Sequence, residues 1–142
     1  MTAPRDPDFE RRVRDSFVRQ RFMATLGATL DVVRPGEIHI GFAHREELAQ
    51  QHGFLHAGVL ASVADSACGY AALSLMEPGC GVLSVEFKIN MLAPAKGESI
   101  VARADVLRAG RTVVVCRADV YAKQSGDEKL VAAMQGTMAV RQ

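Results

Sequence analysis

The residue with the clearest chemical potential is Asp65, an acid in the middle of an otherwise apolar segment, residues 57–76. A helix over this segment is apolar nearly all round, so we expect it to be buried. Burying a carboxylate without partners is costly, and Asp is rarely buried without a purpose. We therefore interpret Asp65 as a base or a nucleophile held in a cleft. The alternative is a structural acid, paired with an arginine or with backbone amides at a subunit contact.

A second group of residues lies at the start of the same predicted helix. His56 precedes it by one residue and stands nine residues before Asp65. The first amides of a helix have no partners within the helix, so the N–H groups of Ala57 and Gly58 can bind a carbonyl oxygen. The positive end of the helix dipole favours that contact, and Gly58 has no side chain to obstruct a ligand. A local hydrogen-bonding role for His56 remains the alternative.

The predicted helix has two unlike faces. One face contains only small residues and the acid, at steps of three or four: Gly58, Ala61, Ser62, Asp65, Gly69 and Ala72. We expect this face to let a second backbone or a thin ligand come close. The opposite face is bulkier and suits packing on a sheet; it contains Leu60, Val63, Ala67 and Tyr70.

The elements that must position these residues follow from periodicity. An amphipathic helix is predicted over residues 7–26, with Asp6 as its cap and Pro7 in its first position. Period-two alternation and turn residues predict strands at 29–34, 37–43, 82–92, 99–108, 112–122 and 130–141. Pro35 and Gly36 join the first two strands as a hairpin. The sequence therefore predicts a single α+β domain over residues 1–142, in which an antiparallel sheet buries its apolar face on the long helix.

Composition narrows the classes of function. The 142 residues are 49% hydrophobic and carry a formal net charge of +1. This charge gives no reason to expect a nucleic acid or an anionic membrane as partner. The polar N-terminus resembles no secretion signal, and Asp65 argues against a membrane span over residues 57–76, so we expect a cytoplasmic protein.

Neither metal nor cysteine chemistry is expected. Three cysteines without a CxxC pair argue against a disulfide framework and against a thiolate zinc site. His52 and His56 are four residues apart, but Gly53 and Gly58 disfavour a helix through both. Cys68 is more simply a small core residue than a nucleophile. We predict no metal and no cofactor.

Taken together, these motifs resemble one family. Residues 50–59, Gln-Gln-His-Gly-Phe-Leu-His-Ala-Gly-Val, and the later Ala-Asp-Ser-Ala at 64–67 resemble the active-site signature of hot-dog acyl-CoA thioesterases of the phenylacetyl-CoA (PaaI-like) type. The family pattern places Asn six residues before a His-Gly-Gly motif and an acid nine residues after the His. His56 and Asp65 keep that interval, whereas Gln50 replaces the Asn and Ala57 replaces the first Gly. Residues 83–97 and 108–112 also resemble the family, and the likeness covers about residues 20–140.

The resemblance implies a hot-dog fold, in which a curved antiparallel sheet wraps the central helix. It also implies a homodimer that pairs into a homotetramer, with an acyl-CoA thioesterase site at the dimer interface. Asp65 would be the general base or the nucleophile, acting on a thioester bound by the other subunit. His56 would position the thioester and the amide of Ala57 would bind its carbonyl oxygen.

The resemblance also gives roles to residues that would assist Asp65 and His56. Ser84 would help to hold the water, and Gln50 or Gln51 would take the role of the family Asn. Lys88, Arg108 and Arg111 are candidates for the CoA phosphates, although each is equally well explained as a solvated strand residue. The sequence does not indicate which acyl group is cleaved.

Two other functions remain open. An enoyl-thioester hydratase of the same fold would also use a His and an acid. A non-catalytic acyl-CoA-binding protein is suggested by the departures at Gln50 and Ala57.

Overall fold

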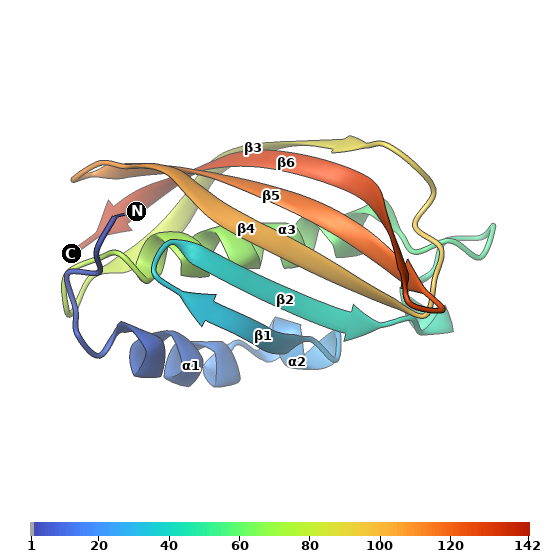
Figure 1. Ribbon diagram of the computed structural model, residues 1–142, viewed down its shortest axis with the longest axis horizontal. Coiled ribbons are helices and arrows are strands. Elements are labelled where there is room, and N and C mark those ends of the chain that lie inside the picture. The colour runs from blue at the N-terminus through green and yellow to red at the C-terminus, as the bar shows by residue number, and fades with distance from the viewer. Residues whose placement is uncertain (1) are drawn as a thin grey trace.

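The computed structural model describes residues 2–142 and shows one antiparallel sheet curved around a long helix (Figure 1). The sheet has six strands in the order β1-β2-β4-β5-β6-β3. The elements, in chain order, are α1 (Phe9–Arg19), α2 (Arg21–Thr25), β1 (Thr29–Arg34), β2 (Glu37–Ala43), the short 3-10 helix η1 (Glu46–Leu48), α3 (Ala57–Leu73), β3 (Gly81–Met91), β4 (Ser99–Ala109), β5 (Val113–Gln124) and β6 (Asp127–Arg141). The predicted α+β architecture is confirmed.

The core lies between α3 and the concave face of the sheet. The bulky face of α3 is buried, with Leu60, Val63 and Ala67 at 0–2% exposure. Alternate residues of the strands meet it, and in β5 these are Val114, Cys116, Ala118 and Val120. Burying one Val or Leu side chain contributes about 1.5–3 kcal/mol, so this interface provides much of the driving force for folding.

The prediction of one continuous helix over residues 7–26 is wrong. The helix begins at Phe9, not at Pro7, and is interrupted at Gln20, whose backbone is extended at φ −80° and ψ 95°. Asp6 does not cap the helix itself, because its carboxylate accepts the N–H of Asp8, 2.9 Å away, within the preceding turn. At this interruption the side chain of Gln20 is bonded to two residues of α3.

The long helix is also shorter than predicted, ending at Leu73 where residue 76 was expected. Arg12 of α1 closes this end: its guanidinium donates to the carbonyl oxygens of Leu73, Met76 and Glu77 at 2.6–2.9 Å. These carbonyl groups belong to the last residue of α3 and to the turn that follows it. The three bonds fix α1 against the end of α3.

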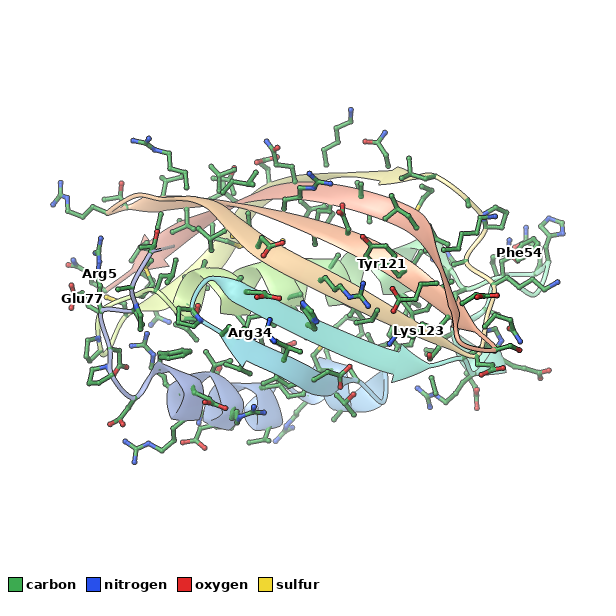
Figure 2. All side chains as sticks on the ribbon, viewed as in Figure 1. Arg5, Arg34, Phe54, Glu77, Tyr121 and Lys123 are labelled. Carbon is green, nitrogen blue, oxygen red and sulfur yellow. The ribbon has the colours of Figure 1, made fainter. Side chains whose placement is uncertain are left out.

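The chain termini lie at one end of the molecule, and the loop that leads into α3 lies at the other (Figure 1). Figure 2 shows Arg5 and Glu77 together at the end that holds both chain termini, and their side chains approach to 3.9 Å. Phe54 lies at the opposite end, on the loop that leads into α3. Within residues 2–142, no helix is both long enough and apolar enough to cross a membrane.

Candidate active site

Asp65 lies in the middle of α3, on the face that the sheet leaves uncovered. It is half-buried, not fully enclosed as the apolar segment suggested. The hydroxyl of Ser84 donates a hydrogen bond to Asp65 Oδ1 at 2.6 Å. None of residues 2–142 donates a hydrogen bond to Asp65 Oδ2, so this oxygen is available to a water molecule.

A β-bulge places Ser84 beside the acid. The pairing of β3 with β6 shifts register between Ser84 and Glu86, so Val85 is an extra residue in β3. Ser84 is paired with Met138, whose side chain is buried on the concave face. Ser84 therefore faces α3, where its hydroxyl reaches Asp65.

A pocket of about 430 Å³ extends from Asp65 toward the end of α3. One wall has little side-chain bulk and comprises Gly69, Gly79, Cys80 and Gly81. The opposite wall comes from α1 and its junction with α2, and comprises Arg12, Ser16, Arg19 and Gln20. Sequence reasoning missed this second wall. Its signal was present, because Arg12, Ser16 and Arg19 follow one another at helical steps of four and three.

Polar groups in this wall form a connected network. Gln20 Oε1 accepts the hydroxyl of Ser66 at 2.9 Å, and Gln20 Nε2 lies 3.3 Å from the hydroxyl oxygen of Tyr70. Ser16 Oγ is also 3.3 Å from that oxygen. Burial raises the pKa of Tyr70, while Ser16 and Arg19 act in the opposite direction. The Tyr70 phenol is therefore a neutral hydrogen-bonding group at neutral pH.

The start of α3 forms a separate group of polar atoms. His56 is the N-cap, and its Nδ1 accepts the N–H of Gly58 at 2.8 Å. The prediction that both first amides are free is therefore wrong for Gly58. The N–H of Ala57 has no acceptor among residues 2–142 and keeps its capacity to bind an oxygen.

Gln50 and Gln51 line a hollow of about 430 Å³ together with His56 and Ala57. Gln50 Oε1 accepts the backbone N–H of His52, which fixes the orientation of the side-chain amide. Gln50 Nε2 is then the free donor of this amide, as a contact to a carbonyl oxygen requires. Gln51 is exposed, whereas Gln50 is half-buried.

One chain does not bring these two groups together. Ala57 and Asp65 are eight positions apart on α3, which corresponds to about 12 Å along the helix axis. A thioester group cannot reach both at once. Gly58 does line a third hollow, of about 520 Å³, together with Asp65 and the small residues between them.

The three candidate cations lie away from Asp65. Lys88 follows Phe87, which faces α3, so Lys88 points to the outer face of the sheet. Arg108 is paired with Val115, between two buried residues of β5, and also faces outward. Arg111 lies in the exposed turn between β4 and β5. Within one chain, none of the three lines the pocket at Asp65.

Cysteine and metal chemistry gain no support. Cys68 is buried against β5, and hydrogen bonding with Cys116 together with burial raises its pKa, which disfavours a thiolate. No cluster of three or more metal-ligating side chains is found over residues 2–142.

The sequence and the fold are similar to those of known thioesterases. The model of the thioesterase superfamily matches residues 52–129, which include His56, Asp65 and Ser84. The chain belongs to the thioesterase superfamily. This thioesterase is 35% identical to human acyl-coenzyme A thioesterase 13 over 115 residues, which span 80% of each chain. It is 26% identical to the 1,4-dihydroxy-2-naphthoyl-CoA hydrolase of Listeria monocytogenes over 82% of this chain and 93% of that protein.

Solved structures of thioesterases have the same fold as this chain. A thioesterase family protein from Silicibacter pomeroyi is 50% identical, with a TM-score of 0.92 over 94% of this chain and 98% of the other. The E. coli PaaI protein from the phenylacetic acid degradation operon has a TM-score of 0.83 over 95% of this chain and 94% of its own, at 20% identity. The second match supports the fold alone. The predicted hot-dog fold, the family and the class of thioester hydrolase are thereby confirmed.

Proposed function

We propose that this thioesterase hydrolyses an acyl-CoA to a free acid and CoA, with Asp65 as the reacting carboxylate in a site completed by two subunits. The observation that carries the proposal is the contact between Asp65 and Ser84, at the mouth of a pocket. Relatives whose names include acyl-coenzyme A thioesterase support the substrate class.

The Asp65 carboxylate supports two routes. As a general base, Oδ2 takes a proton from water while the water oxygen attacks the carbonyl carbon. The tetrahedral oxyanion then expels the CoA thiolate, which takes up the proton from Asp65. As a nucleophile, Asp65 attacks the carbonyl carbon, CoA leaves, and water hydrolyses the mixed anhydride. In the first route the Ser84 hydroxyl orients both the carboxylate and the water.

The start of α3 supplies the groups that stabilise the oxyanion. Ala57 and Gln50 both line the hollow beside His56, and each has a free donor, the N–H of Ala57 and Nε2 of Gln50. Two donors and the positive end of the helix dipole suit a carbonyl oxygen that gains negative charge. His56 holds this turn in place through its bond to Gly58. Gln51, which is exposed beside Gln50, is proposed as a further substrate contact.

The spacing along α3 supports a two-subunit site. Gly58 and Asp65 are equally far from the midpoint between Ala61 and Ser62. Two antiparallel copies of α3 that meet at this midpoint therefore place Gly58 of one copy against Asp65 of the other. Ala61 and Ser62, which lie between them on this face, are small and half-exposed, so two helix backbones can approach closely.

The edge of the sheet offers a second surface for the same homodimer. β3 is an edge strand, and its Leu83, Val85, Phe87 and Met91 are 42–61% exposed. Exposed apolar edge strands are avoided in monomers because they pair with other chains. We propose that β3 pairs with its copy, and that a homotetramer forms from two such dimers. Lys88 lies on this edge strand and is our first candidate for the CoA phosphates, with Arg108 and Arg111 after it.

The test replaces Asp65 and measures CoA release with a thiol reagent over a panel of acyl-CoA substrates. Asp65→Asn and Asp65→Ala should lower kcat by at least about 100-fold while the protein stays folded and dimeric. Asp127→Asn, at an exposed residue where β6 begins, is the matched control and should keep full activity. Full activity in either Asp65 variant would refute the proposal.

The same preparation separates the two other functions. Hydration of an enoyl-CoA without CoA release would indicate a hydratase. Tight binding of acyl-CoA without thiol release would indicate a binding protein. Light scattering on the unmodified chain measures the mass of the assembly, and a monomer would contradict the two-subunit site.

A further inference from the structure

The junction of α1 and α2 carries a feature that hydrolysis at Asp65 does not require. Gln20 interrupts the helix with an extended backbone, and its side chain turns toward α3. There its amide is held at both ends, by the hydroxyl of Ser66 at Oε1 and by the hydroxyl oxygen of Tyr70 at Nε2. The residue is therefore fixed in position by α3.

Gln20 stands where two hollows meet. It lines both the 430 Å³ pocket that runs along α3 and the 520 Å³ hollow toward Gly58, and Asp65 lines both as well. Ser66, which fixes Gln20, is the residue next to Asp65. An acyl chain whose carbonyl lies at Asp65 and which enters the larger part of the pocket must therefore pass the Gln20 amide.

The Gln20 amide has hydrogen-bonding sites that the network with α3 does not use. A glutamine amide has two N–H donors and two acceptor sites, and the network with α3 uses one of each. An alkyl chain packed on the amide would remove water from the remaining sites without replacing its hydrogen bonds. An acyl group with its own hydroxyl would restore them. Tyr70, at the far end of the network, is five residues beyond Asp65, about 7.5 Å along the helix axis.

We infer that Gln20 is a specificity-determining residue of the acyl pocket, which with Ser16 and Tyr70 favours acyl groups that carry a hydroxyl several carbons from the thioester over plain alkyl chains. The inference rests on the proposed function, because it takes the pocket at Asp65 as the acyl site.

The experiment compares two substrates that differ by one hydroxyl, hexanoyl-CoA and 6-hydroxyhexanoyl-CoA. The unmodified thioesterase should have the higher kcat/KM for the hydroxylated substrate. Gln20→Met keeps the length of the side chain and removes the amide, and should reduce the ratio of the two kcat/KM values about tenfold. The change should lie in KM for 6-hydroxyhexanoyl-CoA, and the effect on hexanoyl-CoA should be smaller than the effect on the hydroxylated substrate.

Three variants separate selectivity from a structural role. Gln20→Glu has the same shape and still accepts hydrogen bonds from Ser66 and the substrate, so it should retain the preference that Gln20→Met loses. Gln124→Met removes a glutamine that bonds Glu98 at the far end of β5, and should leave the ratio unchanged. If Gln20→Met does not fold, Tyr70→Phe tests the same network, because it keeps the ring against Phe17 and removes only the hydroxyl.

The results distinguish this inference from the proposed function. Absence of CoA release from every acyl-CoA of the panel by the unmodified chain would overturn the proposed function. Release from other members of the panel, but from neither of these two substrates, would overturn only the role of Gln20. Hydrolysis without preference for the hydroxylated substrate, or a ratio unaffected in both Gln20→Met and Tyr70→Phe, would overturn only the role of Gln20.

Discussion

The contact between Ser84 and Asp65 allows a quantitative prediction. Ser84→Ala removes the one hydrogen bond that the described residues give to the Asp65 carboxylate. A hydrogen bond to a charged group contributes about 1.5–3 kcal/mol, and the exposure of Ser84 places this one in the lower part of that range. A loss of about 1.5–2 kcal/mol in the transition state corresponds to a fall in kcat of about 10- to 30-fold.

The assay is the initial rate of CoA release at saturating substrate, with KM measured alongside. Ser84→Thr keeps the hydroxyl on a residue that strands accept well, and should retain activity within about threefold of the unmodified chain. Ser84 is exposed, so Ser84→Ala should change the free energy of unfolding by about 1 kcal/mol or less. A kcat for Ser84→Ala within about twofold of the unmodified chain would refute the argument that this contact orients the reacting carboxylate.

Two further predictions concern assembly and stability. Val85→Lys puts a charge on the exposed apolar edge of β3 and should yield a monomer by light scattering, with activity reduced at least about 100-fold. The control Val18→Lys, at a 78% exposed site on α1, should stay dimeric and active. A dimeric Val85→Lys would exclude pairing along β3. Asp105→Asn should raise the free energy of unfolding at neutral pH. Asp105 is exposed, but partial desolvation and the neighbouring Glu37 raise its pKa, so its ionised form destabilises the folded state. This gain should disappear in denaturant titrations below about pH 4, where the carboxyl is protonated in both states, and a gain that persisted there would have another cause.

The sheet could be predicted well because its signals are local. β1 and β2 match the predicted ranges, since alternation and the Pro35-Gly36 turn fix both strands, and Gly36 adopts the positive φ of +74° that this turn requires. The other strands begin and end within a few residues of their predicted limits. Asp65 was identified for the same kind of reason, as a single acid among apolar and small residues.

What could not be predicted depends on contacts between distant segments. Residues 7–26 contain no glycine and have no proline after Pro7, so no local signal marks the break at Gln20, where the side chain is bonded to two residues of α3. The approach of Ser84 to Asp65 depends on a bulge that shifts the pairing of β3 by one residue. The amide of Gly58 is occupied because His56 turns its ring back onto the helix, which the spacing alone does not show.

The bonds of Arg12 have a consequence for how such a protein can change over time. Arg12 holds α1, which forms one wall of the pocket at Asp65, against the end of α3 through three hydrogen bonds to residues 73–77. α1 and Gln20 precede the region shared with the superfamily, which contains His56, Asp65 and Ser84. On our proposals, the carboxylate that reacts and the Gln20 wall that selects the acyl group are thus encoded in different stretches of the gene. We therefore expect substitutions at Ser16 or Gln20 to alter the acyl preference without changing Asp65 or Ser84.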